Sequence, residues 1–273
     1  MGLWLVFLIL LLGGTPQAQA ALCRHCHDFS CPHTEQAACG QCHRGNGATR
    51  RKELAHSGLI RAAHSAYGLR LTPRRLAAAE ALQFYGCRRC HQIGGTGERL
   101  ATILDGVVPQ RASVALEQAL DQPALFMPDF DLAVTERDLL ITGLLDAAQR
   151  VAPPSQQPPE VVHFAHPADE AHPFEKHCGA CHRMLTPSAG SLGGGRIGPD
   201  LSGLGGAFYP PTAREGAHWT RAALSDWLVN PRKIRPLSQM PALRLKQQER
   251  EDLLQFFWPL GPAADKENSH EGR

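Results

Sequence analysis

The sequence predicts a mostly α protein, in which a small, loop-rich N-terminal module precedes two larger helical modules. Helix-start signals recur along the chain, and no stretch of alternating apolar and polar residues indicates a substantial sheet. The plan of residues 73–150 is then repeated over 163–260, because each segment holds one short cysteine motif followed by loops and helices. Two similar helical modules are therefore expected.

The helices of these modules are predicted from capping residues and apolar spacing. Thr72-Pro73 places threonine at an N-cap and proline at the first helical position, which predicts a helix reaching Tyr85. Thr135-Glu136-Arg137-Asp138 is similar to a capping box and precedes a leucine-rich helix. In the last module, helices are expected near 219–229 and 247–258. In the N-terminal module, Leu54, Leu59 and Ile60 are spaced for one face of a helix over about 51–67.

The chain begins with an apolar run from Leu3 to Leu12, followed by Ala18-Gln19-Ala20. This pattern is typical of a signal peptide cleaved after Ala20, so a periplasmic or otherwise exported protein is expected. Four prolines among residues 151–160 predict a semi-rigid linker. The predicted divisions are a signal peptide over 1–20, a loop-rich module over 21–72, a helical module over 73–150, a linker over 151–162, a helical module over 163–260 and a disordered tail over 261–273.

Eight of the nine cysteines form four pairs, each with two intervening residues and a histidine directly after the second cysteine. This is the attachment motif of covalent haem c: two thiols bond the vinyl groups of one porphyrin edge, and the histidine becomes the proximal iron ligand. The four motifs predict four covalently bound haem c groups. The cysteines are Cys23, Cys26, Cys39, Cys42, Cys87, Cys90, Cys178 and Cys181, and the histidines are His27, His43, His91 and His182.

Other uses of paired cysteines fit the sequence less well. Zinc sites also use Cys-x-x-Cys pairs, but zinc does not require a histidine after every second cysteine. A thioredoxin-like pair would lie in a βαβ pattern, and a disulfide scaffold suits shorter secreted chains. Cys31 lies outside the four pairs and is expected to be a structural thiol.

Both helical modules resemble class I c-type cytochromes. In the last module, Gly198-Pro199-Asp200-Leu201 is similar to the family's turn whose proline carbonyl accepts a hydrogen bond from the proximal histidine. The segment from Asn230-Pro231 to Gln239-Met240-Pro241 is similar to the family's methionine loop. The resemblance implies that Met240 is the sixth ligand opposite His182, and that Met127, in Phe126-Met127-Pro128, serves opposite His91. The middle module lacks the Gly-Pro-x-Leu turn, and Val108-Pro109 is the expected substitute.

The N-terminal module contains no methionine, so other sixth ligands are expected there. Cys42-His43-Arg44-Gly45-Asn46, together with the residues up to His56, resembles the compact bis-histidine dihaem modules of multihaem cytochromes. Two of His33, His56 and His64 are expected to be distal ligands, with His33 and His56 preferred. A surface histidine remains the alternative for each of them.

The formal net charge of +2 indicates no particular partner, but the charges are unevenly distributed. Residues 44–75 hold eight basic residues and one acid, whereas residues 98–150 hold nine acids and four bases. This asymmetry fits complementary faces that orient modules or partners, or arginines that offset haem propionates. An exported haem protein is not expected to bind nucleic acid.

These observations predict an exported tetrahaem c-type cytochrome that carries single electrons between redox partner proteins in a respiratory chain. The layout resembles multihaem cytochromes, including those of selenite or tellurite reduction and extracellular electron transfer systems, and implies association with a membrane-bound respiratory complex. The alternative is an enzyme, a multihaem reductase or peroxidase with one open haem site. A third option is a structural subunit in which haems serve as core. An electron carrier is favoured because every motif has a candidate sixth ligand.

Overall fold

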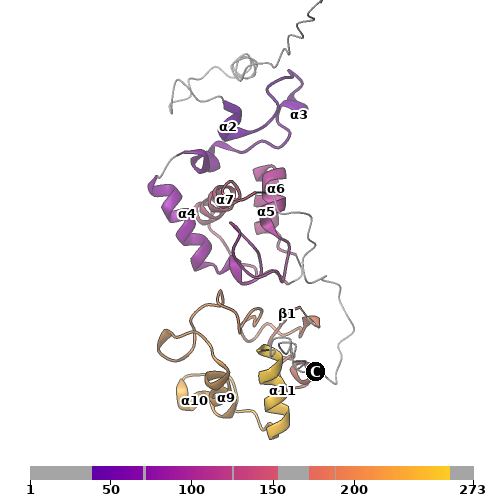
Figure 1. Cartoon of the computed structure of the whole chain (residues 1–273), viewed down its shortest axis with the longest axis vertical. Coiled ribbons are helices and arrows are strands. Elements are labelled where there is room, and N and C mark those ends of the chain that lie inside the picture. The colour runs from indigo at the N-terminus through magenta and orange to yellow at the C-terminus, as the bar shows by residue number, and fades with distance from the viewer. Residues whose placement is uncertain (1–38, 70–71, 125, 153–171, 188, 259–273) are drawn as a thin grey trace, which may run out of the picture.

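The computed structural model describes residues 39–69, 72–124, 126–152, 172–187 and 189–258. Three parts follow one another along the long axis of the molecule in chain order (Figure 1). The described residues are mostly helical, and the two strands among them are short, so the predicted fold class is confirmed. The predicted signal peptide, the first cysteine motif, His33, Cys31, most of the predicted linker and the predicted tail lie outside the described residues.

The N-terminal part consists of α2 (Cys39–His43), α3 (Lys52–Ala55) and the 3-10 helix η1 (Ala62–Gly68). The predicted continuous helix over 51–67 is wrong. The chain leaves α3 after one turn, and Gly58 adopts a φ of 71°, which is left-handed and cannot lie inside an α-helix. Leu54 therefore lies on α3, whereas Ile60 lies in the connection between α3 and η1.

The N-terminal part packs directly onto the middle part. Ile60 belongs to the same buried core as Leu140 and Leu144 of the middle module. The charge asymmetry of the sequence reappears here, because Arg61 forms an ion pair with Glu117 and Arg75 with Asp146. Some of the complementary charges therefore join segments within this chain.

The middle part is built around two packed helices, α4 and α7. Thr72 caps α4 as predicted, and its side chain accepts a hydrogen bond from the amide of Arg75. Helix α7 begins before the predicted capping box, and Glu136 rather than Asp138 accepts a hydrogen bond from the amide of Ala133. The elements are α4 (Pro73–Phe84), η2 (Cys87–Arg89), α5 (Leu104–Val107), η3 (Val108–Gln110), α6 (Ser113–Asp121) and α7 (Val134–Ala148).

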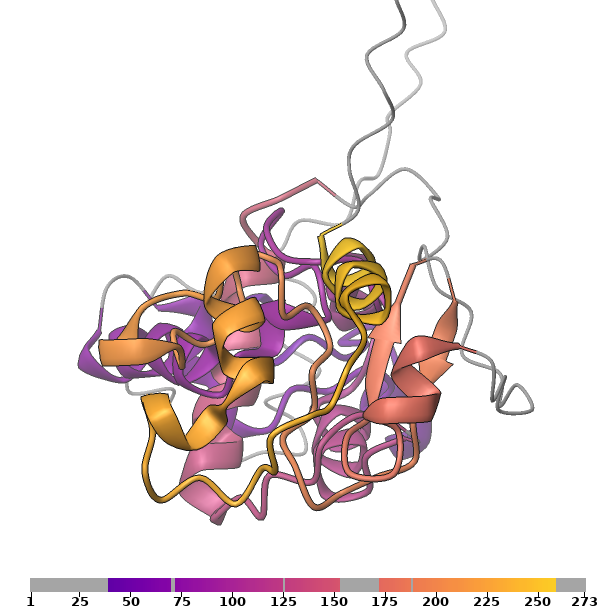
Figure 2. The same cartoon turned by 90° about the horizontal axis from the view of Figure 1, so that it is seen from below.

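The last part combines short helices with a small β-hairpin that the sequence analysis did not predict. Strands β1 (Met184–Thr186) and β2 (Gly190–Leu192) pair antiparallel beside α11 (Figures 1 and 2), and Met184 shares a core with Leu253 of that helix. The predicted helices near 219–229 and 247–258 are present. The helices are α8 (Pro173–His177), η4 (Arg214–Gly216), α9 (Arg221–Val229), α10 (Pro231–Ile234) and α11 (Gln247–Phe257).

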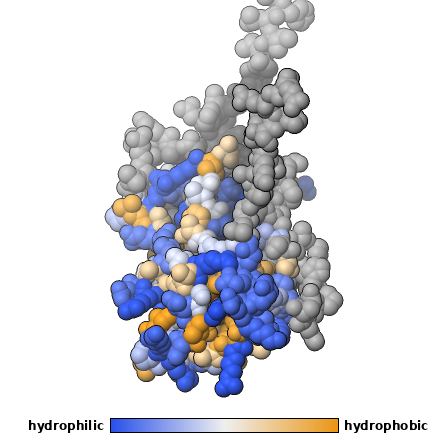
Figure 3. All heavy atoms as spheres, turned by 60° about the horizontal axis from the view of Figure 1, so that its bottom comes forward, coloured by the Kyte–Doolittle hydropathy of each residue, from blue (hydrophilic) through white to orange (hydrophobic). Residues whose placement is uncertain are grey.

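The surface of the last part mixes charged and apolar side chains (Figure 3). Its most exposed large apolar residues include Ile197, Val229 and Leu237. Within the residues that the structure describes, no helix combines the length and apolarity needed to cross a bilayer.

Candidate haem-binding sites

The three described motif histidines share one arrangement. In each, the ring nitrogen Nδ1 lies within hydrogen-bonding distance of a backbone carbonyl that follows the motif. The distances are 3.0 Å from His43 to Ile60 O, 2.7 Å from His91 to Thr102 O, and 2.8 Å from His182 to Pro199 O. A carbonyl can only accept, so the imidazole carries its proton on Nδ1 and its lone pair on Nε2. That tautomer is the one that presents Nε2 to a metal.

The carbonyl acceptor in the middle module is Thr102, not the expected Val108-Pro109. The carbonyls of Val108 and Pro109 instead accept hydrogen bonds from Arg44 of the N-terminal part, at 3.1 and 3.0 Å. The sequence expectation was wrong because it required a proline. Only the carbonyl is used, and any residue supplies one.

Backbone contacts show that segment 101–104 of the middle module is equivalent to segment 198–201 of the last module. The amide of Ala101 donates to Cys90 O, and the amide of Gly198 donates to Cys181 O, both at 2.8 Å. Three residues later, Leu104 donates to Gln92 O and Leu201 to Arg183 O. Ala101-Thr102-Ile103-Leu104 therefore occupies the place of Gly198-Pro199-Asp200-Leu201.

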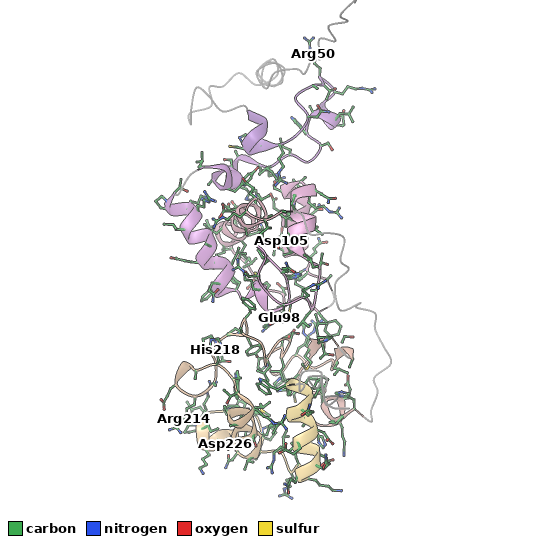
Figure 4. The ribbon with its side chains drawn as sticks, viewed as in Figure 1. Arg50, Glu98, Asp105, Arg214, His218 and Asp226 are labelled. Atoms are coloured by element: carbon green, nitrogen blue, oxygen red, sulfur yellow. The ribbon has the colours of Figure 1, made fainter. Side chains whose placement is uncertain are left out.

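A carboxylate fixes the loop after each of these motifs. Asp105 is 2% exposed and lies within the middle module (Figure 4), where it accepts hydrogen bonds from the amides of Gly94 and Gly95 at 2.6 and 2.9 Å. In the last module, Glu175 accepts from the amide of Gly193 at 2.6 Å. Charge-assisted bonds of this kind hold a loop firmly in place, so both motifs sit in a rigid frame.

The glycine-rich segment of the last module lies directly against its motif. A Cβ atom on Gly198 would overlap the His182 ring, and one on Gly195 would overlap the backbone of Cys181. A side chain at either position would push the chain away from the imidazole. This close approach of the backbone explains why glycine stands at these two positions.

Three of the motif cysteines of the two later modules, Cys87, Cys90 and Cys178, pack against apolar clusters. Burial raises the pKa of Cys87 to about 11 and that of Cys178 to about 12, and it also raises the pKa of Cys90. These thiols are therefore protonated at neutral pH, unlike the reactive thiolates of thioredoxin-type pairs. An apolar environment suits a thioether, which carries no charge.

Met240 lies at the edge of the core formed by Leu204, Leu224 and Leu254. Its sulfur accepts a hydrogen bond from the indole Nε1 of Trp227 on α9, at 3.0 Å. The guanidinium of Arg235 lies 5.5 Å from the centre of the same indole ring. The sulfur is therefore held in a defined place by a donor, which simple packing of a methionine does not require.

Met127 lies in the loop between α6 and α7, where its amide donates to Ala124 O at 2.7 Å. Phe126, the residue before it, packs in a small apolar cluster with Cys90, Leu100 and Leu185. The methionine loop of the middle module is thereby anchored beside the middle motif. Ligation of iron by Met127 and Met240 stays a prediction.

The candidate distal histidines of the N-terminal part differ in their surroundings. His64 is 1% exposed, its Nε2 lies 3.0 Å from a carboxylate oxygen of Glu117, and its Nδ1 lies 3.9 Å from Asp138. His56 is half-buried at the end of α3, where the preceding carbonyl of Ala55 accepts from the amide of Asn46. His64 is thus engaged by carboxylates, and the choice of distal ligands among His33, His56 and His64 stays a prediction.

These observations fit covalent haem. Each described motif histidine has its Nδ1 proton fixed by a carbonyl. Burial raises the pKa of the Cys87 and Cys178 thiols, which keeps these two thiols uncharged. Among the described residues, no three His, Cys, Asp or Glu side chains converge as ligands of a bare metal ion would. Each motif instead offers one imidazole and two thiols, which is the donor set of a covalent porphyrin site.

Sequence reasoning missed three groups that position these sites. Ile60 and Thr102 act through their carbonyls, which no residue type reveals. Trp227 was predicted only as part of a helix. The loop that follows this helix brings Met240 back to the Trp227 indole.

Comparisons with known proteins agree with this geometry. The family model described as cytochrome c matches residues 171–260. The cytochrome c of Cochliobolus lunatus is 32% identical over 94 residues, covering 31% of this chain and 82% of the relative. Those of Stellaria longipes and Arabidopsis thaliana are 30% and 32% identical over 94 residues, covering 31% of this chain and 82% and 80% of the relatives. No solved structure matches. The last module is thus a haem-binding, electron-transfer domain, and the chain belongs to the cytochrome c family.

Proposed function

We propose that this protein is an exported tetrahaem c-type cytochrome that carries single electrons between respiratory partners. The observation that carries the proposal is the shared geometry of His43, His91 and His182, each held by a downstream carbonyl. The same arrangement occurs in the module that matches the cytochrome c family and in the two parts that precede it. Similar geometry at similar motifs supports similar chemistry.

In this proposal each motif supplies two thioether bonds and one proximal histidine, and Cys23, Cys26 and His27 do so in the first motif. Met127 and Met240 are the sixth ligands of the later modules, and His33 and His56 those of the N-terminal module. A bound haem supplies a metal that changes its charge by one electron without breaking a bond. The protein's residues hold that group, exclude water from it and set its potential, which methionine ligation raises relative to bis-histidine ligation.

The proposed organisation is one dihaem module over 21–72 and two class I domains over 73–150 and 163–260. The bis-histidine pair would have the lower potentials and the methionine-ligated pair the higher ones. Electrons would then move along a graded series of sites toward or from redox partner proteins, with a membrane-bound respiratory complex as one such partner.

The haem count is tested by the intact mass of the purified full chain after removal of non-covalent haem. Four attached groups are expected, and the double variant Cys87→Ala/Cys90→Ala should carry three. A variant with Cys31 replaced by alanine serves as the control and should keep four. A wild-type chain with fewer than four attached haems would contradict the tetrahaem proposal.

The alternative is a reductase or peroxidase with one open haem. It requires an iron whose sixth position is vacant or easily displaced. Absorption spectra of the oxidised protein distinguish the two proposals. An electron carrier should be fully low-spin with a methionine-to-iron band, and should not bind carbon monoxide rapidly on reduction. A high-spin band or rapid binding of carbon monoxide would favour the enzyme.

A further inference from the structure

We propose that Arg89 is a positioning residue that joins the middle haem site to the last one, so that electrons pass between these two sites within the chain. Arg89 lies between the two cysteines of the middle motif, yet its side chain reaches the turn that orients His182 in the last module. The proposal rests on the proposed function, because it requires haem at both sites.

The Arg89 side chain makes three contacts with the last module. Its Nη1 donates to the backbone carbonyl of Asp200 at 3.4 Å, and its Nη2 lies 3.7 Å from the Asp200 carboxylate. Its guanidinium carbon lies 5.4 Å from the centre of the Tyr209 ring, within the range of a cation–π contact. The side chain of Arg89 is only 16% exposed, so these contacts are largely shielded from water.

The residues that receive Arg89 belong to the support of His182. Pro199, directly before Asp200, provides the carbonyl that holds the His182 imidazole. Asp200 also lies 3.4 Å from Nε of Arg183, the residue after His182. The hydroxyl of Tyr209 donates to Asp200 O at 3.2 Å, and burial raises the pKa of Tyr209 to about 12, so this donor stays protonated. One turn thus binds both His182 and Arg89.

The backbones of the two modules also meet at this junction. A Cβ on Gly203 would lie 2.8 Å from the carbonyl oxygen of Arg89, so only glycine allows this approach. A Cβ on Gly206 would lie 2.5 Å from Oε1 of Glu98, which lies between the two modules in Figure 4. Cys90 and Leu100 of the middle module share an apolar cluster with Leu185 of the last. The junction is therefore packed as well as charged.

These contacts place Cys90, a haem-attachment cysteine of the middle motif, against the turn that holds the His182 imidazole of the last site. Cys90 interacts with the side chain of Ser202, whose hydroxyl donates to the Asp200 carboxylate at 2.6 Å. A thioether has no proton to donate, so in the loaded protein this is a van der Waals contact. From there a continuous route leads through Asp200 and the Pro199 carbonyl to His182. One electron leaves one site as the other accepts it, and no further reactant is needed.

The experiment compares Arg89→Gln with Arg88→Gln in the full haem-loaded chain. Arg88 lies in the same motif and carries the same charge, but its Nε donates to Ile93 O within the middle module at 3.2 Å. Hydrogen exchange followed by mass spectrometry is read on peptides covering 198–209. In Arg89→Gln this segment should exchange roughly tenfold faster, as expected for losing a partly buried charge-assisted contact, while Arg88→Gln should leave it unchanged.

A second measurement follows the midpoint potential of the last site. In a Met127→His background, the remaining methionine-to-iron band reports only the Met240 site. Arg89→Gln should lower its midpoint, because removing a nearby cation destabilises the reduced, less positive state. Arg88→Gln should shift it much less. Arg89→Lys keeps the charge but not the planar contacts, so it should loosen the segment with little change of midpoint.

The outcomes separate this proposal from the function on which it rests. Equal exchange over 198–209 in the Arg89 and Arg88 variants, or equal shifts of the Met240-site midpoint, would overturn the role of Arg89 while leaving the haem sites intact. If the Met127→His background shows no methionine band, the ligand assignment of the proposed function fails instead. The exchange measurement still decides the coupling in that case, because it does not depend on the band.

Discussion

At the scale of single residues, Gly198 lies so close to the ring of His182 that an added Cβ would overlap it. Gly198→Ala should displace either the turn or the imidazole, because a methyl group there has no space. Overpacking of this kind costs about 1–3 kcal/mol of stability. The variant should also lose haem at the last site, as measured by intact mass together with thermal unfolding.

Gly194→Ala is the matched control for this substitution. A Cβ on Gly194 would meet nothing within 4 Å, although the residue belongs to the same glycine-rich segment. It should keep full haem content and stability. Equal behaviour of the two variants would show that His182 is not held by close backbone contact.

The bond from Trp227 to the sulfur of Met240 makes a second prediction at this scale. Trp227→Phe removes the donor, so the sulfur should give more electron density to iron and stabilise the oxidised state. The midpoint of that site should fall by at most about 60 mV, since a hydrogen bond contributes about 0.5–1.5 kcal/mol. A redox titration that follows the methionine band measures the shift.

Trp219→Phe provides the comparison, because the indole Nε1 of Trp219 donates to the Thr212 hydroxyl at 2.9 Å and not to a methionine. It should leave the methionine band in place. A midpoint that is unchanged in Trp227→Phe would mean that this indole does not influence the sulfur in the loaded protein.

At the scale of elements, α8 and α11 are tied together by Glu249, the N3 residue of α11. Its carboxylate lies 2.6 Å from Lys176 Nζ and 3.2 Å from His177 Nε2, both on α8. The hydrogen bond from Lys176, with that from the amide of Lys246, lowers the pKa of Glu249 to about 2. The helix that precedes the last motif is thereby fixed to the C-terminal helix.

Stability should therefore depend on the protonation of Glu249. Its pKa is lower in the folded than in the unfolded chain, so its contribution is fully present above about pH 4.5 and is lost as the pH falls toward 2. Glu249→Gln should lower the melting temperature near neutral pH and differ little from the wild type near pH 2. Thermal unfolding across this range is the measurement.

Lys176→Gln completes a double-variant cycle for this tie. If the two side chains act on each other, the double variant Glu249→Gln/Lys176→Gln should lose less stability than the two single losses added together. Strictly additive losses would show that the ion pair does not join the helices.

The elements also show what could and could not be predicted from the sequence. Caps such as Thr72 depend on two or three adjacent residues, so α4 began where expected. The 51–67 helix failed because apolar spacing alone cannot distinguish one helix from two short ones around Gly58. The hairpin at 184–192 is too short to give an alternating pattern, and its residues are buried by contacts with distant α11.

The sites divide in a similar way. The cysteines and motif histidines follow from a covalent motif with fixed spacing, and Pro199 could be named from its turn. Thr102 and Ile60 could not be named, because they act through carbonyls that every residue has. Arg89 is a motif residue by sequence, and only the packing of two modules reveals its contact with Asp200.

At the scale of the whole molecule, Glu117 holds the N-terminal part against the middle part. It lies 2.5 Å from Arg61 and 3.0 Å from His64, and its side chain is 9% exposed. Glu117→Gln should cost about 1–3 kcal/mol, because a buried polar group would lose its charged partner. Hydrogen exchange over residues 60–69 should become faster as this segment detaches.

Glu53→Gln is the control for this junction, since Glu53 is an exposed acid on α3. The same change of charge at that position should leave exchange over 60–69 unaltered. Faster exchange in both variants would point to a general effect of net charge and not to a contact between the two parts.

The spacing of the proximal contacts has a consequence for how the protein is made. The acceptor carbonyl follows His91 by 11 residues, and follows His43 and His182 by 17. Met127 and Met240 come much later in the chain. Met127 precedes α7, the last helix of the middle module, and Met240 precedes α11, the last helix of the last module. A chain that emerges from its N-terminus can thus orient each imidazole soon after the motif appears, because local contacts form before distant ones. In the proposed exported cytochrome, haem attachment would therefore proceed motif by motif, and each methionine loop would then close over a site that is already half built.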